Sequence, residues 1–90
     1  MIIPTGRVTR IASFNMERCY IAFQNLNTAA ADKIYLMQQE AEPEVFLAHG
    51  LVIGALGMIE MQNCLNCQSK KAWFAYCEVA AGADLRVVDI

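Results

Sequence analysis

Four cysteines are the side chains of this sequence best suited to hold a metal ion. Cys64 and Cys67 form a C-x2-C pair, while Cys19 and Cys77 are single. Four thiolates can hold zinc in a tetrahedral site, but a zinc ribbon has two C-x2-C pairs and here the second is missing. Cys77 is also in phase with Trp73 on a predicted strand, which indicates a small buried hydrophobe. We therefore predict no bound zinc and keep the four cysteines as weak candidate ligands only.

A thioredoxin-type redox site is a further possibility for the C-x2-C pair. Such a site begins a helix that follows a strand in a βαβ unit. Here the pair lies within a polar segment, Asn63 to Lys70, that is typical of a hairpin connection. The sequence therefore disfavours thiol–disulfide chemistry.

The other titratable side chains do not form a catalytic set. His49 is the only histidine and has small apolar neighbours, so we expect a packed or turn histidine without an orienting partner. Glu40, Glu42 and Glu44 lack the alternating Asp/Asn oxygens and the glycine of a calcium loop, and a solvated loop is expected. No phosphate-binding glycine loop and no G-x-S-x-G motif is present. We predict no catalytic residues, no cofactor and no enzymatic activity.

Basic and aromatic residues near the N-terminus suggest a small nucleic-acid platform. Arg7, Arg10 and Arg18 alternate with Phe14 and Tyr20. The formal net charge of -2 opposes binding to a polyanion. Scattered surface arginines are the favoured interpretation, and no nucleic-acid partner is expected.

The composition indicates one small domain, residues 1–90, with more apolar residues than it can bury. The chain is 57% hydrophobic and only 18% charged, and a domain of this size buries little more than half of its unfolded surface. The longest apolar stretch, Val45 to Ile59, is broken by glycines and is too short to span a membrane. The N-terminus lacks the features of a signal peptide. A homo-oligomer made in a cytoplasm, with no membrane partner, is the simplest expectation.

Short alternating segments separated by turn residues predict the fold. The predicted strands are Arg7–Phe14, Arg18–Leu26, Lys33–Met37, Val45–Leu47, Leu51–Ile53, Met58–Met61, Lys71–Val79 and Leu85–Ile90. This spacing is typical of an all-β protein, a small antiparallel β-sandwich or jelly-roll of seven to eight strands. The predicted inward side chains are Ile21, Phe23, Ile34, Leu36, Trp73, Ala75 and Val87.

Several segments, taken in order, carry a family resemblance. They are residues 15–25 (NMERCYIAFQN), 32–36 (DKIYL), Gly50, 57–60 (GMIE), 72–75 (AWFA) and 83–89 (ADLRVVD). The succession, from about Ile11 to Asp89, resembles small β-sandwich proteins of tailed bacteriophages, namely capsid decoration (cement) or head-fibre-base proteins. The segment with the C-x2-C pair replaces a shorter hairpin of that pattern. The resemblance implies a protein of the outer shell, often a trimer, without catalytic residues.

These observations together predict a non-enzymatic virion protein that decorates or cements the exterior of a phage capsid. Its partners would be the major capsid protein and two further copies of itself, after synthesis in the host bacterium. The expected subunit contact lies in the apolar stretch, at Val45, Leu51, Val52 and Leu56. The alternatives are a phage tail or neck adaptor, and a cytoplasmic OB-like or zinc-stabilised module that binds nucleic acid or peptide.

Overall fold

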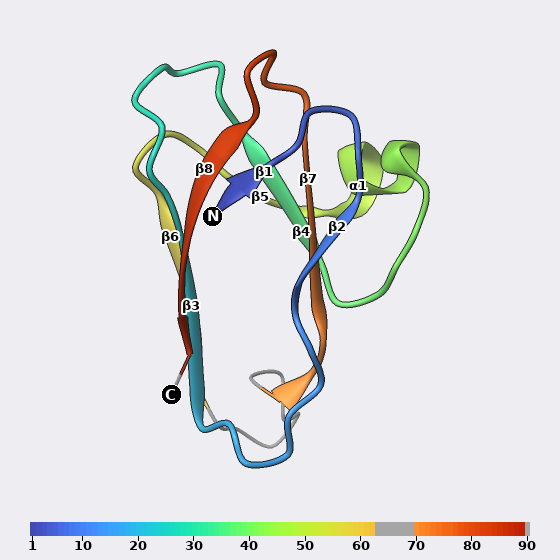
Figure 1. Cartoon of the computed structure of the whole chain (residues 1–90), viewed down its shortest axis with the longest axis vertical. Helices are drawn as coiled ribbons and strands as arrows, with labels where there is room; N and C mark the ends of the chain where they lie inside the picture. The colour runs from blue at the N-terminus through green and yellow to red at the C-terminus, as the bar shows by residue number, and fades with distance from the viewer. Residues whose placement is uncertain (63–69, 90) are drawn as a thin grey trace.

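The computed structural model describes residues 1–62 and 70–89, which form two facing β-sheets and one short helix (Figure 1). The elements are β1 (Ile2–Ile3), β2 (Thr9–Ala12), β3 (Tyr20–Asn25), β4 (Ile34–Met37), α1 (Pro43–His49), β5 (Leu51–Ile53), β6 (Met58–Gln62), β7 (Trp73–Cys77) and β8 (Ala83–Asp89). Both sheets are antiparallel and have four strands, which confirms the predicted all-β sandwich.

The strand order is that of a jelly roll. One sheet runs β1-β8-β3-β6 and the other runs β2-β7-β4-β5. Apart from the β4–β5 connection, which carries α1, each connection takes the chain from one sheet to the other. Strand β8 therefore lies between β1 and β3, far from both in sequence. Strands β5 and β6 end the two sheets.

The core lies between the sheets and is built from the alternate residues of the central strands. Ile21 and Phe23 of β3 face Trp73 and Ala75 of β7, and all four are buried. The rings of Phe23 and Trp73 lie 5.0 Å apart in a tilted arrangement. Period-two alternation places these side chains on one face of each strand. Of the predicted inward set only Val87 is partly buried, and it packs against the edge of the same core.

Helix α1 replaces a predicted strand. The segment Val45–Leu47 is helical, so the prediction of a strand there is wrong. Pro43 occupies the first helical turn, where its fixed φ suits a helix and its missing N–H costs nothing. Phe46 is fully buried, and its ring lies 6.1 Å from that of Tyr76 on the outer face of the second sheet. The helix therefore covers that face.

Asn25 joins three loops at the end of β3, where its side chain is fully buried. Its amide nitrogen donates to the carbonyl oxygens of Asp32, at 2.7 Å, and Ile53, at 3.0 Å. Its side-chain oxygen accepts from the backbone and side-chain nitrogens of Asn27, at 2.9 and 2.6 Å. Because a buried amide needs such partners, Asn25 fixes where β5 ends and the following turn begins.

Candidate functional site

The side of the sandwich bounded by β5 and β6 exposes the largest run of apolar residues that are close in sequence. Within the described residues, β5 pairs only with β4, and β6 only with β3. The short turn at 54–57 joins them, so both sheet edges open on the same side (Figure 1). The exposed apolar side chains of residues 47–58, between 42% and 59% accessible, are Leu47, Leu51, Val52, Leu56 and Met58. They do not all point the same way, because Leu51 pairs with the buried Leu36 whereas Val52 pairs with Tyr35 on the outer face. We call these five residues the β5–β6 side.

Leu56 stands out because its backbone is in the left-handed region, with φ of 60°. It lies in the turn closed by the hydrogen bond from Gly57 N to Gly54 O, at 2.9 Å. That region disfavours a bulky side chain and favours Gly or Asn. Leu56 is also 59% exposed. Leu56 is therefore both strained and exposed, which makes it a candidate functional residue.

Three of the four predicted contact residues, Leu51, Val52 and Leu56, are exposed in or next to β5, and their role as a contact stays a prediction. Val45, the fourth predicted contact residue, lies on α1 and is half-buried. Met58, which sequence reasoning missed, is exposed there. Its position could have been read from the alternation of β6, where Ile59 packs against the core.

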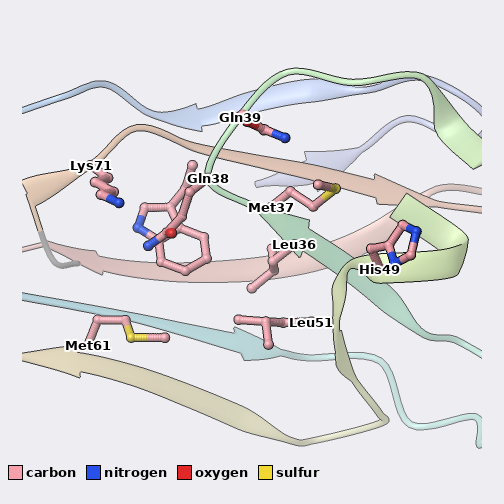
Figure 2. A pocket seen from close by; sticks show the side chains of 9 residues that line it. Leu36, Met37, Gln38, Gln39, His49, Leu51, Met61 and Lys71 are labelled. Carbon is pink, nitrogen blue, oxygen red and sulfur yellow. The ribbon is translucent and has the colours of Figure 1, made fainter. Parts of the chain in front are cut away.

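A pocket opens between the two sheets beside the start of β5 (Figure 2). Its volume is about 440 Å³. Its lining residues are Leu36, Met37, Gln38, Gln39, His49, Leu51, Met61, Lys71 and Trp73. His49 is the last residue of α1 and is exposed, so of the two expectations, a packed histidine or one in a turn, the packed one is wrong. The pocket thus combines an apolar wall with several nitrogen donors.

The cysteines are only partly placed by the structure. Cys77 is fully buried, as predicted, with its Sγ 3.3 Å from the carbonyl oxygen of Ile3. Cys19 is exposed. Cys64 and Cys67 lie outside the described residues. Among residues 1–62 and 70–89 no three His, Cys, Asp or Glu side chains gather as metal ligands. The absence of zinc stays a prediction.

The candidate arginine platform loses one member, because Arg18 is buried rather than on the surface. Its Nε and Nη2 donate to the two carboxylate oxygens of Asp89, at 2.9 and 3.1 Å. Its Nη2 and Nη1 also donate to the carbonyl oxygens of Ser13, at 2.9 Å, and Lys71, at 3.2 Å. The expectation of a surface arginine is wrong for Arg18, which ties β8 to two loops. Arg7 and Arg10 are exposed, as expected.

Two tyrosines have perturbed phenol groups. Tyr20 donates to a carboxylate oxygen of Glu60 at 2.6 Å, and this hydrogen bond is the main cause that raises the pKa of Tyr20 above 10.0. Burial against α1 raises the pKa of Tyr76, and the hydrogen bond to Glu78 adds to the effect. Both phenols therefore act as hydrogen-bond donors at neutral pH. Glu40, Glu42 and Glu44 are exposed, as expected, although Glu44 lies in the first turn of α1 rather than in a loop.

In the part of the chain that the structure describes, no helix has the length and apolar character needed to cross a membrane. Comparisons with protein-family models, curated proteins and solved structures gave no match to this chain. The function must therefore be inferred from the fold and from the exposed chemistry.

Proposed function

We propose that this chain is a non-catalytic structural protein of a bacteriophage virion, which associates with copies of itself and decorates or cements the outer surface of the capsid. The β5–β6 side carries the proposal. It supplies the contact between subunits, and other faces of the sandwich meet the major capsid protein. The resemblance in segments 15–25, 57–60, 72–75 and 83–89 supports the phage class.

The edge of β5 lacks two of the features that keep sheet edges from associating. Natural edges are protected by a short strand, charged side chains, proline or a covering element. Strand β5 has the sequence Leu-Val-Ile, so it is short but carries neither a charge nor a proline. On β6, by contrast, the exposed side chain of Glu60 is charged and accepts a hydrogen bond from the hydroxyl of Tyr20. Because β5 is only three residues long, packing of Leu51, Val52 and Leu56 supplies more of the contact than a backbone ladder does.

A second copy of the chain is the occupant that suits this side best. An apolar surface without charge can face itself around a symmetry axis with no like-charge repulsion. Threefold closure hides the surface on every copy at once, and capsids offer threefold and quasi-threefold positions for a trimer. The proposed localisation is therefore the capsid exterior.

Other function classes receive less support. A tail or neck adaptor would use the same apolar side and differs only in its position on the virion. An OB-like module would need a five-stranded barrel, whereas this chain has two separate four-stranded sheets. A single-stranded nucleic-acid platform would need arginines beside exposed aromatic rings. Arg18 is buried in an ion pair instead.

Replacing Leu56 tests the contact. Leu56→Asn removes the apolar side chain but suits the left-handed turn, so the fold is kept. Light scattering after size-exclusion chromatography should show a trimer for the wild type and smaller species for the variant. Met16→Asn is the matched control, since Met16 is 71% exposed in the β2–β3 loop, at the opposite end of the molecule (Figure 1). A wild type that stays monomeric at tens of micromolar would contradict the contact.

Co-sedimentation with purified capsids of the encoding phage tests the partner. The wild type should sediment with capsids and Leu56→Asn should do so less, because a monomer loses the avidity of three linked contacts. Binding to tails and not to heads would favour the adaptor. No binding to either particle would contradict the virion role.

A further inference from the structure

We propose that the pocket beside β5 binds a small carboxylate with a short apolar body, and that the indole N–H of Trp73 and the ammonium group of Lys71 receive the carboxylate. This ligand site does not depend on the proposed function, although it shares Leu51 with the proposed subunit contact. Three observations support the proposal: the pocket itself, the indole N–H of Trp73 without an acceptor among the described residues, and the positive charge of Lys71.

The pocket exists because β5 is too short to cover β4. Pairing between the two strands ends at Leu36 opposite Leu51, whereas β4 continues to Met37. On the other sheet, β6 runs on to Met61 and beyond. The inner walls of both sheets are therefore reachable between these strand ends. The volume of about 440 Å³ falls in the range of small-molecule sites, roughly 300–1,000 Å³.

Trp73 contributes a buried donor whose acceptor is not found among residues 1–62 and 70–89. The residue is 1% exposed, and among the described residues nothing accepts a hydrogen bond from its Nε1. Buried N–H groups without acceptors are rare, because each forgoes the bond that it would make to water. The contact with Phe23, at 5.0 Å between rings, holds the indole in place. The donor is thus rigid, and the residue that carries it lines the pocket.

The burial of Trp73 also decides which ligands are excluded. A sugar that stacks on tryptophan needs an exposed ring face, and here the faces are packed in the core. Only a ligand that presents an acceptor atom to the ring edge suits this site. An oxygen of a carboxylate is such an acceptor and forms a strong bond when the donor is desolvated.

The charge of the lining favours an anion. Lys71 comes two residues before Trp73, and no Asp or Glu is among the described lining residues. Figure 2 shows Lys71 and His49 at opposite ends of the pocket, with Leu36 and Leu51 between them and Met61 below Lys71. The carboxylate therefore belongs at the Lys71 end, and an apolar body of the ligand lies along the three hydrophobic side chains.

Phenylacetate is a suitable probe, and the wild-type protein reports on it directly. Trp73 is the only tryptophan, so its fluorescence and its single indole N–H resonance in NMR spectra both arise at the pocket. We expect a saturable downfield shift of that resonance with a Kd below about 1 mM. Phenylacetamide, which has the same shape without the charge, should bind at least about tenfold more weakly. No saturable shift, or equal binding of the amide, would overturn the proposal.

Two variants separate the roles of the donors. Lys71→Met should weaken phenylacetate binding by about tenfold or less, and Lys33→Met, an exposed lysine that does not line the pocket, should leave it unchanged. Trp73→Phe, followed by calorimetry, should abolish measurable binding. If that variant does not fold, the wild-type and Lys71→Met titrations still test whether the pocket binds phenylacetate. Equal binding by wild type and Lys71→Met would remove the assigned role of the cation.

The same titration in a Leu56→Asn background distinguishes this site from the subunit contact. Leu51 belongs to both surfaces, whereas Leu56 does not line the pocket. Unchanged phenylacetate affinity in Leu56→Asn is expected whether or not the protein forms trimers. Loss of binding in that variant would show that the pocket needs the assembled contact and would overturn its independence.

Discussion

Replacing Arg18 by methionine should be among the most damaging single changes outside the hydrophobic core. Arg18 is 3% exposed, and methionine can occupy the space of its aliphatic stem while removing the guanidinium group. The change removes two bonds to Asp89 and two to backbone carbonyls of separate loops. The residue therefore joins β8, the β2–β3 loop and the segment before β7.

The expected loss of stability is the sum of the losses at each hydrogen-bond partner of Arg18. The side chain of Asp89 is 44% exposed, so solvent screens the ion pair, which contributes about 1 kcal/mol. The carbonyl groups of Ser13 and Lys71 are only partly buried and lose about 1 kcal/mol each. The sum, about 3 kcal/mol, is large beside a total stability of roughly 5–13 kcal/mol for a domain of this size. The midpoint of thermal unfolding should fall by about 12–24 °C.

Urea unfolding followed by circular dichroism measures this loss. Asp89→Asn should cost less, about 1–2 kcal/mol, because Arg18 keeps its two carbonyl acceptors. Arg10→Met, at an exposed position on β2, is the control and should change stability by less than about 0.5 kcal/mol. A loss below about 1 kcal/mol for Arg18→Met would refute the role assigned to the buried guanidinium.

Three further outcomes are expected. Asn25→Ala should lower the free energy of unfolding by about 2–4 kcal/mol in urea titrations, because two carbonyls and a neighbouring amide lose their partner; a change near zero would contradict this. Gly82→Ala should cost about 1–2 kcal/mol, since φ is 84° and an added Cβ would lie 2.9 Å from a β1 side chain. Gly54→Ala, with open space around it, is the matched control. Because Glu60 raises the pKa of Tyr20, the contribution of this hydrogen bond to stability should stay constant from neutral pH to pH 10.0 and be lost as pH rises through the raised pKa. Tyr20→Phe should reduce that alkaline loss. An unchanged pH profile in this variant would count against the prediction.

Alternation made the central strands predictable from sequence. In β3 Ile21 and Phe23 alternate with Ala22 and Gln24, and in β7 Trp73, Ala75 and Cys77 share one face, so both the strands and their inward faces follow from period two. The apolar residues around Phe46 also predicted a strand, yet they form α1. The signal that could have separated the two is Pro43, which begins a helix as readily as it ends a strand.

The remaining features depend on contacts that a linear pattern does not contain. Asp89 lies 71 residues from Arg18, so nothing near Arg18 reveals that it is buried and paired. The pocket likewise arises from unequal strand lengths on two sheets, and its donor, Trp73, reads in sequence as an ordinary core residue. The left-handed backbone of Leu56 is set by the turn between β5 and β6, which places a residue there that local preference disfavours.

The central position of β8 has a consequence for synthesis. Until Ala83–Asp89 has left the ribosome, β1 has no neighbour in its sheet and β3 lacks one of its two. The nascent chain therefore cannot complete this sheet during translation, and until then β1 and one edge of β3 stay without their partner strand. Pairings so distant in sequence fold on a scale of about milliseconds to seconds. A chain cut short before β8 would have no route to the sandwich, so premature termination should yield an aggregating or degraded product rather than a smaller folded domain.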